Sequence, residues 1–430
     1  MGNRVRCVDT AFLTIMESPF KYTVHGPDVL GRRADAKSRL DGAPIRALFA
    51  SHGSRLFGGA ELYLFELVRA LAQTEQVYPI VSVPQQGEFT DALARAGIPF
   101  IVVSTPRWTP SDPGAFDGIH PWRRARLTAS LLVGVLVYAA VIRATRPDVV
   151  VTNTATIPTP ALACALLHKP HIWLLHEFVT LDHHFPYLLG ERVSQHLIGR
   201  LSVLVIANSS AVRQHFAPGV PLSKSRVIHP SVSACARENR IAPGELRVLL
   251  LGNQTATKGT ELAVRAVARL ASEEPRFQVT LRLVGPVAPE YRRAIAKLCE
   301  ELAVSDAVTV FDFAVDPSSH FDWSNVVLMC SENEAFGRVT AEALKCGRPV
   351  VGARSGGTRE IVTHGVDGLL FDPGDFRDLA SCLSALGNDQ NLLATLSREA
   401  RIRSSARFLM EDEVEQFSQL LANVAAKEAR

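Results

Sequence analysis

The chain contains no cysteine pair at a metal-binding or redox spacing. Its seven cysteines are scattered, their number is odd, and no Cys-x-x-Cys occurs. Several stand among apolar residues, which favours small core residues and reduced, unpaired thiols in the cytosol over a disulfide framework. Zinc-finger spacing is absent as well, so a structural zinc site is not expected.

A long basic run is also missing, as is the aromatic motif typical of RNA-binding sheets, so no nucleic-acid partner is expected. The net charge is only +3, but it is unevenly distributed. Residues 1–244 carry 25 Lys and Arg against 17 Asp and Glu, a balance of +8, and residues 245–430 carry 21 against 26, a balance of −5. The basic half favours an acidic acceptor or an anionic membrane surface as its partner.

No segment has the properties of a signal peptide or of a full-length spanning helix. Asp9 and Glu17 interrupt any apolar core near the N-terminus. The uncharged run at 127–142, between Arg126 and Arg143, is shorter than the roughly 20 residues that cross a bilayer. We interpret it as a buried or partly interface-facing helix. The chain is expected in the cytoplasm. A peripheral position on the inner face of the membrane is the alternative.

Length and periodicity predict two domains. A chain of 430 residues with 47% hydrophobic residues is globular and too long for one core. From Ile45 short apolar runs alternate with helical patterns, and a second such series begins after a polar stretch that ends near residue 244. This alternation predicts two doubly wound α/β domains with parallel sheets. The expected boundaries are an N-terminal extension at 1–42, a first domain at 43–232, a second at 245–400 and a C-terminal helix at 401–430.

The segment at 331–350, SENEAFGRVTAEALKCGRPV, is the most informative part of the chain. It lies between two apolar runs and predicts a strand–loop–helix–strand passage, with the helix beginning near Gly337 and ending at Gly347. Glu334 then lies in the loop at the carboxyl end of a strand, and Glu342 about one turn into the helix. Two carboxylates and a helix N-terminus would face the crevice above a parallel sheet, a place suited to a ligand with a phosphate.

Two further loops follow predicted strands. Gly58 and Gly59 precede a helix and allow close backbone approach to a phosphate or sugar, although neither the dinucleotide nor the P-loop fingerprint is present. A glycine turn with only a packing role is the alternative. In the second domain, Gly252 and Asn253 lead to Lys258 at a helix start, where an ammonium group and backbone N–H groups suit a diphosphate. A solvated surface lysine is the alternative.

His176 directly follows an apolar run and should emerge at the carboxyl end of a strand in the first domain. A lone histidine is more often structural than functional, so both interpretations stay open. Glu177, Asp182, His183 and His184 follow it, but their spacing fits no zinc pattern. We interpret these four as surface groups and expect no metal site and no cofactor.

The 331–350 motif resembles the donor-site signature of retaining GT-B glycosyltransferases, family 4 (glycosyl transferases group 1). The likeness continues through SGGTREIV at 355–362 and GVDGLL at 365–370, and the order Gly-Gly-Ala-Glu at 58–61 is similar to the same family. It covers about residues 45–400. It implies a GT-B fold, two Rossmann-like domains with a cleft between them. It further implies metal-independent transfer, with retention, from a UDP- or GDP-sugar to a glycan or lipid-linked acceptor, as in polysaccharide biosynthesis.

The resemblance also implies roles for single residues. Glu334 and His176 would contact the transferred sugar, Lys258 would hold the diphosphate, and Glu342 would bind the ribose hydroxyls. Backbone N–H groups would face the sugar, and the remaining donor-site residues are Gly58, Gly59, Gly252, Asn253, Phe336, Gly337, Arg338 and Val339. Family members commonly carry Arg where this chain has Asn253, so one expected cation is missing.

Two alternatives share this fold. A nucleotide-sugar epimerase would need no acceptor, and the paired carboxylates Glu334 and Glu342 argue against it. A catalytically silent binding protein is the other, and Lys258 argues against it while Asn253 argues weakly for it.

Overall fold

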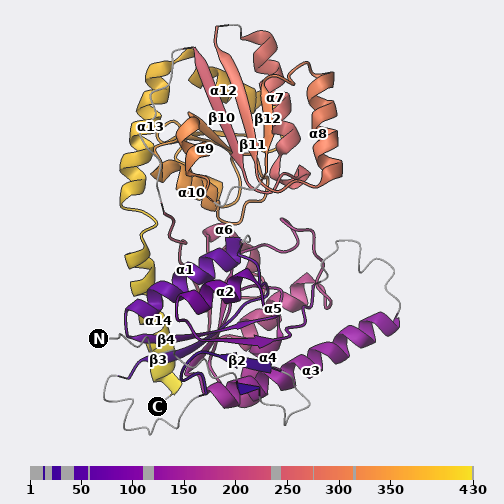
Figure 1. The fold of residues 1–430 in the computed structure, drawn as a ribbon, viewed down its shortest axis with the longest axis vertical. Helices are drawn as coiled ribbons and strands as arrows, with labels where there is room; N and C mark the ends of the chain where they lie inside the picture. Colours follow the sequence, from indigo (N-terminus) through magenta and orange to yellow (C-terminus); the bar gives the residue numbers. More distant parts are fainter. Residues whose placement is uncertain are drawn as a thin grey trace, which may run out of the picture. The chain divides into compact units, whose positions relative to one another are not determined.

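The computed structural model describes residues 13–14, 22–30, 43–56, 59–109, 121–233, 244–274, 276–312 and 316–428. Contacts between residues divide the chain into two compact units, and Figure 1 draws the α/β layers of each. The first comprises Met1–Asn208, Arg213–Ile228 and Met410–Arg430, and the second comprises Ser209–Val212 and His229–Leu409.

The first unit is built on a mixed sheet. Its described strands are β1 (Leu13–Thr14), β2 (Tyr22–His25), β3 (Ile45–Ala50), β4 (Val77–Val83), β5 (Phe100–Val103), β6 (Val149–Thr152), β7 (His171–Leu175), β8 (Leu204–Ala207) and β9 (Ser225–Val227). They lie in the order β1-β2-β5-β4-β3-β6-β7-β8-β9. The strands from β3 to β9 pair parallel with one another, as the periodicity predicts.

The expectation of an all-parallel sheet is wrong at one edge of this unit. Strand β2, from the stretch predicted only as an extension, pairs antiparallel with β5, and Tyr22 lies opposite Val103. Strand β1 pairs antiparallel with β2. In β2 the side chains of Tyr22 and Val24 are buried while those of Thr23 and His25 are not. Four residues are the shortest alternation that indicates a strand, so the signal in the sequence is weak.

Helices cover both faces of the first sheet. They are α1 (Gly59–Gln73), α2 (Glu88–Arg95), α3 (Pro121–Thr145), α4 (Thr159–Leu167), α5 (Glu191–Leu201), α6 (Ser210–Phe216) and α14 (Met410–Glu428), with a short 3-10 turn at Leu222–Lys224. Phe49 of β3 packs in one core with residues of α1 and α14, and Leu48 packs in another core with residues of α3 and α4. Successive residues of a strand point to opposite faces, so β3 serves both cores.

The second unit has a sheet whose described strands are all parallel, as predicted. The strands are β10 (Glu245–Leu251), β11 (Gln278–Val284), β12 (Val308–Phe311), β13 (Val326–Met329), β14 (Val350–Ala353) and β15 (Gly368–Phe371), in the order β12-β11-β10-β13-β14-β15. The chain order reverses between β10 and β13. Open α/β sheets place ligands at the carboxyl ends of strands at such a switch point.

The helices of the second unit connect these strands. They are α7 (Thr260–Glu273), α8 (Pro289–Glu301), α9 (Ser318–Trp323), α10 (Arg338–Lys345), α11 (Thr358–Ile361), α12 (Phe376–Asn388) and α13 (Gln390–Ser405), and a 3-10 turn at Ala256–Lys258 precedes α7. Helix α10 confirms the helix predicted between Gly337 and Gly347. Lys258 was expected at a helix start, but it ends the 3-10 turn instead.

Candidate functional site

A cavity of about 110 Å³ lies where β10 and β13 end, at the switch point of the second sheet. Its lining brings together five of the residues predicted for the donor site, Gly252, Lys258, Glu334, Arg338 and Val339. A larger hollow of about 300 Å³ lies along β10, β11 and β12, but none of the predicted site residues lines it. The smaller cavity is therefore the candidate site.

Lys258 and Glu334 form an ion pair in this cavity. The Lys258 Nζ atom lies 2.7 Å from Glu334 Oε2. The turn that carries Lys258 comes close to the end of β13 because Gly259, with φ of 72°, has no side chain. A Cβ atom there would lie 2.5 Å from the Cβ atom of Cys330. The sequence predicted both charged residues for the site, but it did not predict their direct contact.

A glycine pair supports the loop that carries Glu334. The N–H of Gly357 donates to the carbonyl oxygen of Glu334 at 2.7 Å. A Cβ atom on Gly356 would lie 2.2 Å from that same oxygen, and one on Gly357 would lie 2.2 Å from the carbonyl oxygen of Phe336. The Ser-Gly-Gly-Thr sequence thus packs against the loop that carries Glu334 and fixes its position. The sequence analysis did not predict this role.

Helix α10 places two more predicted residues beside the cavity. Gly337 caps the helix N-terminus with φ of 95°, a backbone conformation that favours glycine. One turn on, Glu342 Oε1 accepts a hydrogen bond from Arg338 Nε at 2.9 Å. Both side chains are largely buried, with 19% and 17% of their area exposed. The predicted position of Glu342 is confirmed, and the pairing with the Arg338 side chain is new.

The charges of these four side chains cancel. Lys258 and Arg338 contribute two positive charges, and Glu334 and Glu342 contribute two negative ones. Asn253, where the family commonly has Arg, is exposed at the end of β10. A diphosphate that entered the cavity would have to draw the cations away from the carboxylates, and it would find one cation fewer than the family provides.

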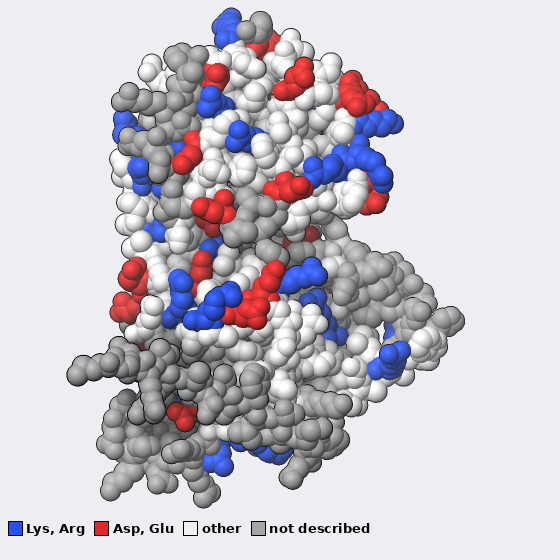
Figure 2. Space-filling model, in the orientation of Figure 1, with Lys and Arg blue, Asp and Glu red and all other residues white. Residues whose placement is uncertain are grey.

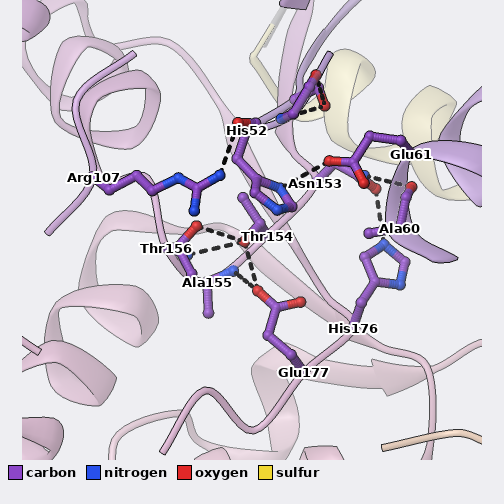
Figure 3. A network of polar contacts seen from close by, with 12 residues as sticks. His52, Ala60, Glu61, Arg107, Asn153, Thr154, Ala155, Thr156, His176 and Glu177 are labelled. Carbon is purple, nitrogen blue, oxygen red and sulfur yellow. Dashed lines mark hydrogen bonds and ion pairs between the residues drawn. The ribbon is translucent and has the colours of Figure 1, made fainter. Parts of the chain in front are cut away.

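The first unit carries a polar network at the carboxyl edge of its sheet, which Figure 3 shows. His52 follows β3, Asn153 follows β6, and His176 and Glu177 follow β7. Parallel strands bring these loops to one edge of the sheet. Two more members, Glu61 and Arg107, come from α1 and from the loop after β5.

The hydrogen bonds of Asn153 fix the state of His176. The side-chain amide of Asn153 donates to the carbonyl oxygen of Ala60 at 3.0 Å, so its Oδ1 atom faces His176 Nε2 at 2.8 Å. An oxygen can only accept, so the hydrogen is on Nε2 and the Nδ1 atom keeps a lone pair. Burial lowers the pKa of His176 to about 3, so the ring is neutral near pH 7. His176 can therefore bind a hydroxyl group but does not supply a positive charge.

His52, which is partly exposed, and the buried Glu61 form a second pair in the network. His52 Nδ1 lies 3.3 Å from Glu61 Oε1. Burial lowers the pKa of His52 to about 3 and raises the pKa of Glu61. Gly53 makes room for the carboxylate, since a Cβ atom there would lie 2.3 Å from Glu61 Oε1. Glu61 is the last residue of the Gly-Gly-Ala-Glu order at 58–61. This order is the feature of the sequence that could have pointed to the pair.

The interpretation of Glu177 as a surface group is wrong. Its side chain is buried, and Glu177 Oε1 accepts hydrogen bonds from Thr154 Oγ1 at 2.5 Å and from the Ala155 N–H at 2.8 Å. Burial raises the pKa of this carboxyl, and the two hydrogen bonds oppose that shift. Within the described residues, no group of three or more His, Cys, Asp or Glu is placed to hold a metal ion.

The two predicted glycines of the first unit have different outcomes. Gly58 lies outside the described residues. Gly59 begins α1, and the position of its missing Cβ atom is open, with no atom within 4 Å. Its predicted part in binding a donor stays a prediction.

Two family models match adjoining parts of the chain. The model described as Glycosyltransferase Family 4 matches residues 57–234, and the one described as Glycosyl transferases group 1 matches residues 234–403. A D-inositol 3-phosphate glycosyltransferase from Thermobispora bispora is 36% identical over 200 residues, which are 44% of this chain and 46% of that protein. An N-acetyl-alpha-D-glucosaminyl L-malate synthase from Bacillus anthracis is 29% identical over 44% of this chain and 48% of its own length. The matches thus span under half of these curated relatives.

Solved structures share the fold over most of the chain. Anabaena Alr3699/HepE, in a crystal structure with UDP-glucose, has a TM-score of 0.68 and 23% identity, and the match covers 88% of this chain and 100% of that one. Sucrose-phosphate synthase from Thermosynechococcus elongatus has a TM-score of 0.67 and 20% identity, with 89% and 100% covered. Together with the two Rossmann-like sheets, these likenesses establish the predicted GT-B fold.

Proposed function

Because the chain belongs to the family 4, group 1 glycosyltransferases, we propose that it moves a hexosyl group from a UDP- or GDP-sugar to a glycan or lipid-linked acceptor, with retention of configuration. The observation that carries this proposal is the Lys258–Glu334 pair in the cavity where β10 and β13 end. The structures of Anabaena Alr3699/HepE with UDP and with UDP-glucose support a nucleotide-sugar donor.

The charged side chains of the second unit suit each part of such a donor. When the bond to the sugar breaks, negative charge develops on the leaving diphosphate. The Lys258 ammonium and the N–H groups at the start of α10 stabilise that charge. Glu334, released from Lys258, accepts hydrogen bonds from sugar hydroxyls, and Glu342 accepts them from the ribose. On the first unit, the His176 Nδ1 lone pair accepts a hydrogen bond from a substrate hydroxyl.

Thermal unfolding with a panel of UDP-, GDP- and ADP-sugars tests the proposal. A ligand that binds only the folded state raises its stability by about 2.7 kcal/mol at 100 times its Kd. We expect the nucleotides of one base to raise Tm in a dose-dependent way and the other bases to act weakly. No shift with any of the three bases would refute donor binding.

Transfer should not need a metal ion, because Lys258 and the start of α10 provide the positive charge that a metal ion would otherwise supply. We expect the rate of donor consumption to stay unchanged after EDTA treatment and dialysis. A rate that falls with EDTA and returns when Mg²⁺ is added would contradict this mechanism.

Replacing Asn253 with Arg should tighten nucleoside diphosphate binding. The four paired side chains have no net charge, so one added cation at the end of β10 favours the anionic ligand. An exposed ion pair contributes about 0.2–1 kcal/mol, so the gain should be roughly 1.4-fold to fivefold in Kd, and salt should reduce it. Calorimetry at low and high salt measures both effects.

The control for this variant is Gln390→Arg, which adds the same charge at an exposed position at the start of α13. It should leave the affinity unchanged. Equal gains for both variants would mean that net charge, rather than the position of Asn253, causes the effect.

The alternatives predicted from the sequence, an epimerase and a silent binding protein, are not favoured. Both family models describe glycosyltransferases, and this match outweighs the weak argument that Asn253 provides for a silent binding protein.

A further inference from the structure

Helix α3 of the first unit has an outer face of apolar side chains in contact with solvent. Leu132, Val133 and Leu136 expose 63%, 53% and 50% of their area, and Trp122 exposes 57%. Farther along the same helix, Tyr138 and Val141 are buried in a core of the sheet. The helix is thus apolar on the face that packs against the protein and on the face that does not.

Trp122, Val133 and Leu136 lie on one line along the helix, and the exposed side chain of Leu132 borders this line. Positions 122, 126, 129, 133, 136, 140 and 143 recur every three or four residues, the spacing of one helix face. They are Trp, Arg, Ala, Val, Leu, Ala and Arg. An apolar stripe therefore runs between Arg126 and Arg143, about 25 Å apart at 1.5 Å per residue. We refer to positions 122–143 of this face as the α3 stripe.

The charged residues of helix α3 itself are of one sign. Helix α3 contains no Asp or Glu, and its Arg residues are at 123, 124, 126 and 143, with Arg146 just beyond its end. The side chains of Arg124, Arg126, Arg143 and Arg146 are exposed. In Figure 2, the lower right of the first unit shows blue and white atoms, and no red atom, outside the grey ones. An apolar face with this charge pattern fits a partner that is apolar inside and negatively charged at its surface.

A second copy of the chain that pairs through its own α3 does not provide that partner. Two copies that paired these helices antiparallel about a two-fold axis would bring Arg126 of one against Arg143 of the other, and α3 holds no carboxylate to compensate. A membrane with acidic lipids provides both components, since acyl chains can cover the apolar stripe and headgroup phosphates can pair with the arginines.

The helix cannot leave the protein to span a membrane without disrupting a core. By length and composition α3 resembles a spanning helix. However, 33% of its apolar stretch is buried inside the first unit. The Tyr138 hydroxyl lies 3.2 Å from Ser82 Oγ and 3.0 Å from Thr105 Oγ1. The buried side chains hold the helix on the sheet, so only its outer face is accessible to lipid.

Trp108, which comes shortly before α3 in the sequence, has no part in the exposed face of this helix. Trp108 is 2% exposed, stacks on Trp173 and donates a hydrogen bond to the carbonyl oxygen of Ala155 at 2.7 Å. Trp122 is exposed and remains at the first turn of α3.

We propose that the α3 stripe lies in the plane of an anionic membrane, with its apolar side chains at the acyl boundary and its arginines among the phosphates. This surface would hold the enzyme where lipid-linked acceptors are found. Docking depends on α3 alone, whereas donor binding depends on the second unit, so the two proposals can fail separately.

Flotation of the full chain with lipid vesicles tests the docking. We expect the protein to float with vesicles in which about a third of the lipid is phosphatidylserine and to remain in the soluble fraction with phosphatidylcholine alone. Each basic group near such a surface contributes about fivefold to partitioning. The variant Arg126→Ser with Arg143→Ser should therefore lower the partition coefficient about 30-fold.

A second variant, Leu132→Ser with Leu136→Ser, should lower partitioning at least tenfold, because each exposed leucine side chain loses its burial in lipid. The matched control is Leu222→Ser with Ile402→Ser. It removes two aliphatic side chains away from α3 that are exposed to a similar degree, 59% and 57%. Unchanged Tm and nucleotide response show that each variant is folded. Equal soluble recovery with both vesicle types, or flotation of the leucine variant like the parent, would overturn the proposal and assign the stripe to another partner.

Discussion

Replacing Lys258 with Ala should lower kcat for sugar transfer by about 10²–10³-fold. Removal of one positioned group that stabilises the developing charge of a transition state typically has an effect of this size. Lys258 is the cation in contact with Glu334 across the cavity, at 2.7 Å. Its loss removes positive charge from the leaving diphosphate and also leaves the Glu334 carboxylate, 15% exposed, without this ion pair. Steady-state kinetics with the donor selected by the thermal-shift panel measures the effect.

The control is Lys297→Ala on helix α8, where the lysine is 76% exposed and pairs with Glu301 on the same helix. Such a surface pair contributes little, so kcat should stay within about twofold of the parent. Lys258→Arg keeps the positive charge but replaces the compact ammonium with a planar guanidinium. We expect this variant to recover only part of the rate. A Lys258→Ala enzyme with parental kcat would rule out the assigned role.

Replacing Glu342 with Ala should weaken nucleotide binding by about 1–3 kcal/mol, roughly 5- to 150-fold in Kd. In the proposed donor complex this largely buried carboxylate accepts hydrogen bonds from the ribose hydroxyls, which lose that partner when it is removed. Glu342 also orients Arg338, whose Nε atom donates to it at 2.9 Å. Calorimetry with the nucleoside diphosphate measures the loss without requiring the acceptor.

Glu301→Ala is the matched control for this prediction. Glu301 lies on α8 and is 58% exposed, so its removal should leave Kd unchanged. A Glu342→Ala variant whose nucleotide affinity equals that of the parent would show that the ribose contacts other residues. A fall in kcat alone would instead indicate a role confined to the transition state.

The periodicity of the sequence predicted the elements that carry the second-unit site. Strand β13 and helix α10 lie where the apolar runs and the glycines at 337 and 347 place them. Continuous apolar runs such as Val326–Met329 indicate strands buried on both faces, and glycine ends a helix for a local steric reason. The antiparallel strand β2 was missed because its pairing with β5 joins residues about 80 positions apart and leaves little local signal.

Side-chain contacts were less predictable than the positions of the residues. The ion pair between Lys258 and Glu334 joins two loops 76 residues apart, and it forms because Gly259 and the pair at 356–357 let three backbone segments approach closely. Glu177 looked like a surface group because polar residues follow it in the chain. Its burial results from Thr154 and Ala155 on the neighbouring strand end, which only the sheet order brings near.

A crystal structure of the chain with the nucleoside diphosphate selected by the thermal-shift panel tests the central claim most directly. We predict density for the diphosphate beside the Lys258 ammonium and the first turn of α10, and density for the ribose within hydrogen-bond distance of Glu342. The Lys258–Glu334 and Arg338–Glu342 contacts should lengthen as the ligand takes their place. Density for the nucleotide away from the ends of β10 and β13, with both ion pairs intact, would contradict the proposed donor site.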